Sequence, residues 1–224
     1  MVRRKGHQAG TTYWRTGKSP CSAISHPTMT IQTDTKGWRI HTLHTNNDAT
    51  IRDWLTDTGS LTRRLQALGT FSVVVLSQQL ALPTRDEAAL LGLRNGQLAW
   101  IREVALCLDG KPVVFAHTAL PRHPRGPVLR WLKRLGNRSL GALLFAHPGF
   151  SRGPLVAQRL DHRHALHKPA LEAFQDNVSC PPEFWARRSS FSFRGQRLLV
   201  TEVFSPTVSK LHFKIPLDAR RQAL

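Results

Sequence analysis

The fold of this chain is decided by residues 100–121, WIREVALCLDGKPVVFAHTALP. Two apolar runs stand on either side of Asp109-Gly110, a dipeptide typical of the tight turn in a β-hairpin. The segment therefore predicts two antiparallel strands, with residues 113–120 as the return strand.

One charged side chain interrupts the apolar face of the first strand. Because side chains alternate between the two faces of a strand, Arg102 shares its face with apolar residues alone, namely Trp100, Val104, Leu106 and Leu108. A lone charge on a core-facing stripe costs free energy unless it has a partner.

A second strand, residues 198–204, has the same property. There Glu202 shares a face with Leu198, Val200 and Phe204. If the two strands are neighbours, Arg102 and Glu202 form a structural ion pair. If they are not, both charges are candidates for a ligand site, and the pattern alone leaves the two interpretations open.

Short elements with recognisable ends flank these strands. Before the hairpin we expect a helix through Ile51, Trp54 and Leu55 capped by Asn47 or Asp48, a second helix opened by Ser60 and ended by Gly69, a buried strand over 71–76, and a third helix begun by the capping box of Thr84 and Glu87. After the hairpin we expect a helix through Leu129, Leu132 and Leu135 ended by Gly136, and a short helix opened by Ser139. A turn is expected at Arg194-Gly195-Gln196.

Composition limits the class of protein. The chain has 224 residues, 41% of them hydrophobic, which suits one domain with tails. No apolar run approaches the ~18 residues of a membrane span, and no apolar segment follows the basic start as in a secretory signal. Cys21, Cys107 and Cys180 are widely spaced and odd in number, which argues against a disulfide framework and against a zinc site built on Cys pairs, so we expect a reducing cytoplasm.

The net charge of +18 would suit nucleic acid or an anionic surface. However, the positive charges are scattered, and aromatic residues do not alternate with them as in a platform that stacks bases. We therefore expect no specific nucleic-acid partner. A positive field of this kind would also attract a small dianion.

Three segments lack a regular pattern. Residues 1–37 carry no acidic residue before Asp34 and predict a disordered basic tail, within which Met29 is an alternative start. Residues 147–183 are rich in His, Arg and Pro and predict a loop-rich insert, and residues 207–224 form a C-terminal extension.

The predicted insert holds three histidines with metal-like spacing, His162, His164 and His167, which we call the histidine cluster. No acidic or cysteine ligand on a regular element accompanies them, so a solvated basic loop is favoured over a metal site. The pair Ser189-Ser190 lacks the Gly-x-Ser-x-Gly turn of a hydrolase, which disfavours nucleophilic catalysis.

Four ordered blocks resemble the chorismate pyruvate-lyase family: DWLTDTGSLTRRL (53–65), the hairpin segment 100–121, LGNRSLGALLF (135–145) and WARRSSFSFRGQRLLVTEVFSP (185–206). The resemblance covers roughly residues 38–206. It implies an α+β fold in a single domain, with an antiparallel sheet, helices packed on one side of it, and a buried site for chorismate.

By position, the family's substrate-binding residues fall on Leu61, Arg102, Leu140 and Glu202. Arg102 would hold a carboxylate, and Glu202 would accept a hydrogen bond from the ring hydroxyl or act as a general acid or base. At Leu61 and Leu140 the first N–H groups of a helix would bind an anion, and core packing is the alternative for both leucines.

The resemblance implies a lyase that makes 4-hydroxybenzoate and pyruvate from chorismate for ubiquinone, without a cofactor or a metal. We expect a monomer whose partner is the small molecule chorismate. The other interpretation is a non-catalytic small-molecule-sensing domain of the same fold, as in bacterial transcription regulators. The segment before Asp53 is too short and irregular for the winged helix-turn-helix that would precede such a domain.

Overall fold

The computed structural model describes residues 37–39, 49–122, 128–174 and 183–211. The expected basic tail lies outside these residues apart from Gly37, and so does the C-terminal extension beyond Leu211. The two candidate caps of the first helix, Asn47 and Asp48, also lie outside them.

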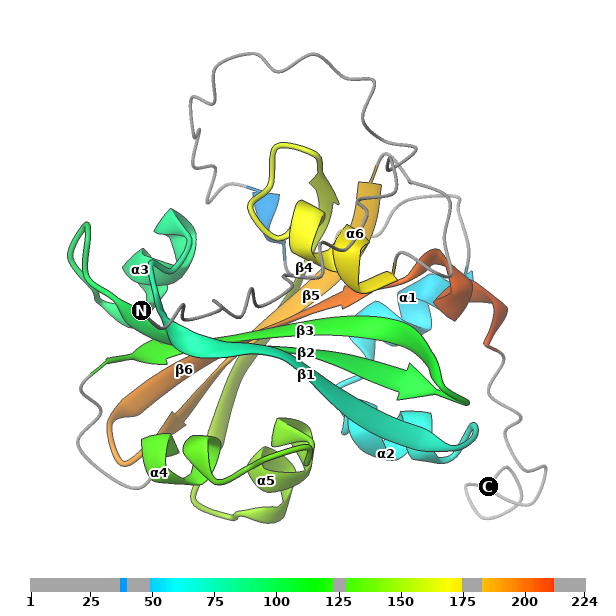
Figure 1. The fold of residues 1–224 in the computed structure, drawn as a ribbon, viewed down its shortest axis with the longest axis horizontal. Helices are drawn as coiled ribbons and strands as arrows, with labels where there is room; N and C mark the ends of the chain where they lie inside the picture. The colour runs from blue at the N-terminus through cyan, green and yellow to red at the C-terminus, as the bar shows by residue number, and fades with distance from the viewer. Residues whose placement is uncertain (1–36, 40–48, 123–127, 175–182, 212–224) are drawn as a thin grey trace, which may run out of the picture. The chain divides into compact units, whose positions relative to one another are not determined.

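Six antiparallel strands form one sheet, in the order β1-β2-β3-β6-β5-β4 (Figure 1). The strands are β1 (Phe71–Ala81), β2 (Ala99–Leu108), β3 (Lys111–Pro121), β4 (Ser151–Asp161), β5 (Glu183–Phe193) and β6 (Gln196–Phe204). The α+β class and the antiparallel sheet are therefore confirmed.

Two tight turns fix the register of the sheet. Asp109 and Gly110 between β2 and β3 both have positive φ, 51° and 76°, as a two-residue hairpin turn of type I′ requires. Arg194 and Gly195 between β5 and β6 repeat this geometry, with φ of 48° and 78°. Both predicted turns are confirmed.

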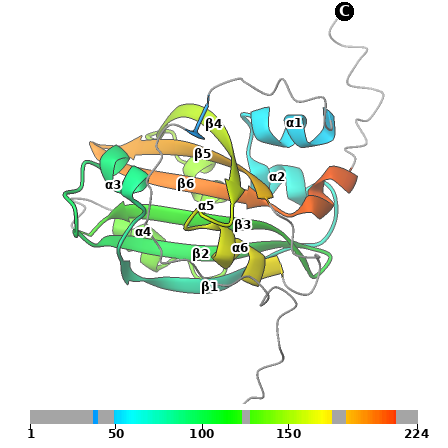
Figure 2. The same ribbon diagram turned by 90° about the horizontal axis from the view of Figure 1, so that it is seen from above.

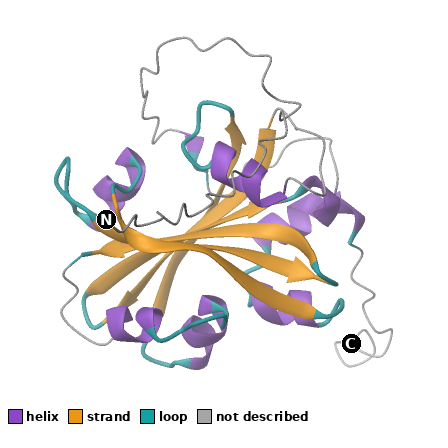
Figure 3. Cartoon of the chain, in the orientation of Figure 1, coloured by secondary structure: helices purple, strands orange, loops and turns teal. Residues whose placement is uncertain are grey.

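The helices are short and several begin where their caps predict (Figure 3). They are α1 (Ala49–Thr56), α2 (Leu61–Gln66), α3 (Arg85–Leu91), α4 (Val128–Lys133), α5 (Leu140–Ala146) and α6 (His167–Phe174), followed by the 3₁₀ helix η2 (Pro206–Lys210). Ser60 and Ser139 cap α2 and α5, and Thr84 and Glu87 form the complete capping box of α3.

Helices cover both faces of the sheet, which corrects the expectation of one covered side. α3 and α6 pack on one face, while α1, α2, α4 and α5 pack on the other (Figures 1 and 2). The reason is visible in β3, where eight consecutive residues from Val113 to Leu120 are all buried. A strand that is buried on both faces has a continuous apolar run rather than an alternating one.

Two further expectations need correction. The strand predicted over 71–76 forms but is only partly buried: Val73 is 7% exposed, whereas Val74 and Leu76 of this edge strand are 49% and 46% exposed. The segment 147–183, expected to be a loop-rich insert, contains β4 and α6. Its polar composition fits a second edge strand, since an edge strand tolerates polar and charged residues.

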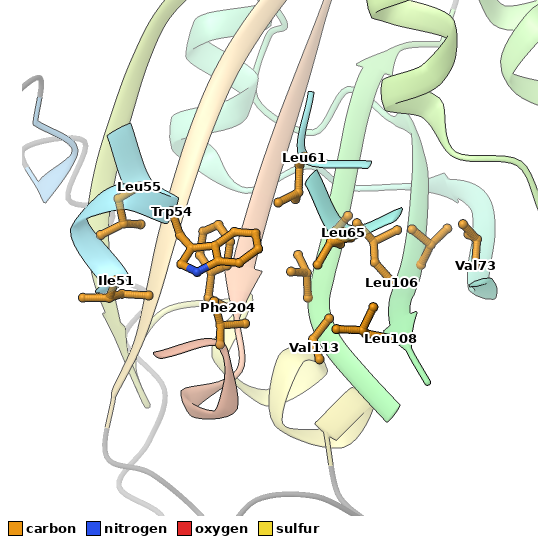
Figure 4. Packing of buried hydrophobic residues seen from close by; sticks show 14 residues of the cluster. Ile51, Trp54, Leu55, Leu61, Leu65, Val73, Leu106, Leu108, Val113 and Phe204 are labelled. Atoms are coloured by element: carbon orange, nitrogen blue, oxygen red, sulfur yellow. The ribbon is translucent and has the colours of Figure 1, made fainter. Parts of the chain in front are cut away.

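A cluster of buried side chains anchors α1 and α2 to the sheet (Figure 4). Trp54 of α1 is fully buried and lies beside Phe204 of β6, with 6.3 Å between the ring centroids. Leu61 and Leu65 of α2 pack against the β2 face that carries Leu106. This packing holds the first turn of α2 over the strands that carry Arg102 and Glu202.

Candidate functional site

A cavity of about 620 Å³, counting the space at its mouth, lies between the sheet and helices α2 and α5. Its lining comes from β2, β3, β4, β5 and β6 and from the two helices, and consists of Leu61, Thr62, Arg102, Val104, Leu106, Ala116, Thr118, Ser139, Leu140, Gly141, Leu144, Phe145, Arg152, Arg187, Ser189, Phe191, Val200 and Glu202. All four predicted binding residues are among them.

Rows of side chains that cross the strands form the floor of this cavity. One row, read across paired strands, consists of Gln78, Arg102, Thr118, Val200 and Ser189. The next row on the same face consists of Val104, Ala116, Glu202 and Arg187. Strands are ~4.8 Å apart and rows on one face are ~7 Å apart, so the backbones at Arg102 and Glu202 are separated by about 12 Å.

Arg102 and Glu202 do not form an ion pair, because β3 lies between their strands. The structural interpretation of these two charges is therefore wrong, and both side chains line the cavity. The separation of their backbones places the two side chains at different points of the cavity lining.

Arg102 is held by neutral acceptors. Its guanidinium donates to Gln78 Oε1 at 2.5 Å and to the carbonyl oxygens of Gly136 at 2.6 Å and Arg138 at 3.5 Å. Its side chain is buried, and this burial lowers the pKa of Arg102. Among the described residues, no carboxylate lies within ion-pair distance of Arg102. The cation is thus oriented but not neutralised.

Glu202 has a different partner, Arg187 of the adjacent strand β5. Arg187 Nε donates to Glu202 Oε2 at 2.5 Å, while its Nη1 donates to the carbonyl oxygens of Trp54 and Asp57 at 2.7 and 2.8 Å. Arg187 is 1% exposed. It therefore fixes the position of Glu202 through a charge-assisted hydrogen bond, and it also fastens the end of α1 to the sheet.

Leu61 and Leu140 are the first residues of α2 and α5, and both line the cavity. The two helix starts are joined by a short hydrogen bond between the hydroxyls of Thr62 and Ser139. The helices have six and seven residues, and the Oγ of each capping serine already accepts one N–H of the first turn. Anion binding by the remaining N–H groups stays a prediction.

The lining residues that the sequence did not assign to this site include Arg152, Arg187 and Ser189. Arg152 Nε donates to Ser189 Oγ at 2.9 Å and its Nη1 donates to the Thr58 carbonyl at 2.6 Å. The alternation at Phe191 and Phe193, continued backwards along β5, would have placed Ser189 and Arg187 on the core-facing side. Arg152 gave no such signal, since it lies in the segment expected to be a loop.

A second group of buried charges lies under α3, on the opposite face of the sheet. Arg188 pairs with Asp86, lies 3.7 Å from Glu87, and donates to Thr201 Oγ1 at 2.9 Å. His117 lies between Glu87 at 3.4 Å and Glu103 at 3.0 Å. Each positive group here has at least one carboxylate beside it, so this cluster fastens α3 to the sheet.

The charges of this second cluster shift one another's titration. Burial alone would raise the pKa of Glu87, but the neighbouring His117 and Arg188 lower it to about 2. Burial alone would lower the pKa of His117, but Glu87 and Glu103 raise it to about 9. Both shifts favour the charged forms, as expected for a structural network.

The remaining candidates from the sequence lie elsewhere. Two members of the histidine cluster pack against aromatic rings, His164 against Trp38 and His167 against Phe184. Within the described ranges, no group of three or more His, Cys, Asp or Glu side chains is placed to hold a metal ion. Among the same residues, no helix is long and apolar enough to cross a membrane.

Comparisons with known proteins agree on one family. The family model described as chorismate lyase matches residues 36–214. A "probable chorismate pyruvate-lyase" of Aromatoleum aromaticum is 48% identical over 184 residues, covering 82% of this chain and 99% of that protein. A protein of the same name from Dechloromonas aromatica is 43% identical over 175 residues, covering 78% of this chain and 97% of that protein.

Similarity to solved structures is weaker. The C-terminal domain of the histidine utilization repressor from Pseudomonas syringae is 13% identical with a TM-score of 0.49, covering 66% of this chain and 99% of that one. PhnF from Mycobacterium smegmatis is 17% identical with a TM-score of 0.48, covering 67% of this chain and 65% of that one. From the family model and the two relatives above 40% identity, the chain belongs to the chorismate lyase family.

Proposed function

We propose that this protein is a chorismate pyruvate-lyase that converts chorismate to 4-hydroxybenzoate and pyruvate. One observation carries the proposal. Leu61, Arg102, Leu140 and Glu202, which the family resemblance marks for substrate binding, come from four separate elements and line the same cavity. Family membership supports the same reaction.

The reaction is an elimination whose atoms balance without another reactant. The carbon–oxygen bond between the ring and the enolpyruvyl ether breaks, and that oxygen becomes the ketone of pyruvate. The hydrogen of the hydroxyl-bearing ring carbon is transferred to the enol methylene, which becomes the methyl group of pyruvate. The ring becomes aromatic, and this gain drives the reaction.

In this reaction the protein contributes positioning and electrostatics. Arg102 holds the ring carboxylate through a charge-assisted pair, which its neutral contacts leave available. Glu202 accepts a hydrogen bond from the ring hydroxyl, a role that suits a carboxylate whose position is fixed by Arg187. Val104, Leu106 and Val200 supply an apolar floor for the ring.

The finer assignments of this proposal follow from the chemistry. Because the elimination is redox-neutral, it requires no redox cofactor, and we expect it to proceed without a metal ion. The 4-hydroxybenzoate formed would serve ubiquinone synthesis, with the protein acting as a monomer in the cytoplasm. The buried free thiol of Cys107 is compatible with a reducing compartment.

The proposal is tested by incubating the purified protein with chorismate. Formation of 4-hydroxybenzoate and pyruvate in equal amounts, faster than in the absence of protein, is the expected result. Binding of chorismate or 4-hydroxybenzoate without turnover would instead favour the small-molecule-sensing alternative.

A further inference from the structure

The cavity holds more positive charge than one carboxylate requires. Three of its lining residues are arginines, Arg102, Arg152 and Arg187, while Glu202 is the single carboxylate of the lining. Glu202 forms an ion pair with Arg187, with 2.5 Å between Glu202 Oε2 and Arg187 Nε. Two guanidinium groups therefore face the cavity without a carboxylate within ion-pair distance among the described residues.

Hydrogen bonds hold the guanidinium of Arg152 in place and leave some of its N–H groups available to a ligand. A guanidinium has five N–H groups, and the contacts of Arg152 within the described residues use its Nε and its Nη1, toward Ser189 Oγ and the Thr58 carbonyl. The group also lies 5.4 and 5.5 Å from the ring centroids of Phe145 and Phe191. Such contacts orient a cation without neutralising it.

The surroundings of Arg152 favour an anionic ligand. Burial and the charge of Arg187 lower the pKa of Arg152, while Glu202 and Asp57 act in the opposite direction. A partly desolvated cation without an adjacent counter-ion gains more from a bound carboxylate than a solvated one does. Arg152 is therefore positioned to bind an anion rather than to serve as a structural ion-pair partner.

The position of Arg152 matches one part of chorismate. If Arg102 on β2 binds the ring carboxylate and Glu202 on β6 accepts the ring hydroxyl, the ring axis runs across the strands from β2 towards β6. The enolpyruvyl ether is attached to the carbon next to the hydroxyl, so its carboxylate lies beyond the Glu202 end of the ring. Beyond β6 the sheet order leads through β5 to β4, where Arg152 lies opposite Phe191 and its guanidinium donates to Ser189 Oγ and to the Thr58 carbonyl at the cavity.

We propose that Arg152 binds the enolpyruvyl carboxylate of chorismate and so distinguishes the substrate from 4-hydroxybenzoate. This inference rests on the proposed function. It assigns one guanidinium to each carboxylate of the dianion, Arg102 to the one that stays on the ring and Arg152 to the one that leaves with pyruvate. The product keeps only the first carboxylate and makes no contact with Arg152.

The test compares two ligands on two arginine variants. Arg152→Gln should lower kcat/KM for chorismate about 10- to 100-fold, the effect of one charge-assisted hydrogen bond, and leave the Kd of 4-hydroxybenzoate within about twofold. Arg102→Met should weaken the binding of both chorismate and 4-hydroxybenzoate. Arg159→Gln is the matched control, since Arg159 lies on the same strand but pairs with Glu183 outside the cavity lining.

A rise in melting temperature on adding 4-hydroxybenzoate to the Arg152→Gln protein shows that its site is folded. Arg152→Lys, which keeps the charge and loses the planar fork, should fall between wild type and Arg152→Gln. If Arg152→Gln weakened the binding of both ligands equally, or left chorismate kinetics unchanged, the inference would be overturned while the proposed function would stand. Absence of chorismate turnover in wild type would overturn the proposed function, and the inference would fall with it.

Discussion

Two buried arginines on opposite faces of the sheet should respond in opposite ways to the same substitution. Arg102 and Arg188 are 3% and 2% exposed, so replacing either by Met removes a buried charge and keeps an unbranched side chain. Arg188 has carboxylates beside it, Asp86 in an ion pair and Glu87 at 3.7 Å. Arg102 has only neutral oxygen atoms as acceptors.

The structure gives the size of each effect on stability. Arg188→Met leaves the carboxylate of Asp86 without its ion pair, which costs about 3–5 kcal/mol and lowers Tm by about 6–20 °C in a chain of this length. Arg102→Met loses hydrogen bonds to neutral acceptors but also removes an unpaired buried charge. These contributions oppose each other, so the net change should be about 2 kcal/mol or less.

The effects on activity should be reversed. A carboxylate bound by Arg102 through two charge-assisted hydrogen bonds at about 1.5–3 kcal/mol each predicts a loss of about 10²- to 10⁴-fold in kcat/KM for Arg102→Met. Arg102→Lys should recover part of this loss, because a point charge replaces the planar fork. Arg188→Met should retain its kcat/KM once corrected for the folded fraction, since its contacts lie on the face away from the cavity.

The measurements are thermal unfolding and steady-state turnover of chorismate for the three variants and wild type. Unchanged kinetics in Arg102→Met would refute the assignment of Arg102 to the substrate. A loss of Tm in Arg102→Met as large as that in Arg188→Met, with little loss of activity, would make Arg102 a structural residue.

Three further predictions concern charge and cofactors. Glu202→Gln keeps the shape and an acceptor for Arg187, so turnover should fall about tenfold or more with a modest loss of Tm; near-normal turnover with a large loss of Tm would leave Glu202 a purely structural partner of Arg187. His117, whose pKa is raised from 6.5 to about 9, contributes stability that is complete below pH 6.5 and lost as the pH rises through 9. Glu87, whose pKa is lowered from 4.5 to about 2, contributes stability present above pH 4.5 and lost as the pH falls through 2. Chemical denaturation from pH 3 to about pH 10 should show both declines, and an alkaline decline unchanged in His117→Gln would contradict the role of His117. Exhaustive chelation and dialysis should leave turnover unchanged, and activity restored by a divalent metal would revive the histidine cluster as a metal site.

Local signals in the sequence were sufficient for the turns and the caps. Positive φ at Asp109 and Gly110 and the capping box at Thr84 depend on neighbouring residues alone. The alternation that singled out Arg102 and Glu202 is also local, because a side chain's face is set by its position along its own strand. These features were therefore predictable.

Strand order was not predictable in the same way. Whether Arg102 meets Glu202 depends on β3 lying between their strands, which no local pattern states. β4 was not predicted, because an edge strand does not need an apolar pattern on both faces. Arg152, which lies on β4, was therefore not considered as a binding residue. The covering of both faces could have been predicted from the continuous apolar run of β3.

The two faces of the sheet show how buried charge divides between structure and function. Under α3, His117 and Arg188 each lie beside carboxylates, and despite burial these neighbours shift the pKa values of Glu87 and His117 in the direction of the charged forms. Such a network is complete without a ligand. In the cavity, Arg102 and Arg152 are oriented by neutral oxygen atoms, so no adjacent carboxylate compensates their buried charge until an anion binds.

This difference predicts which ligand the cavity prefers. A dianion supplies one carboxylate to each of the two unpaired guanidinium groups, Arg102 and Arg152, while a monoanion leaves one of them uncompensated. Breaking the ether bond divides the two negative charges between the products, so neither product satisfies both arginines. The charge arrangement that favours chorismate binding therefore also favours release once the bond is broken, because each product alone is held by fewer contacts than the substrate.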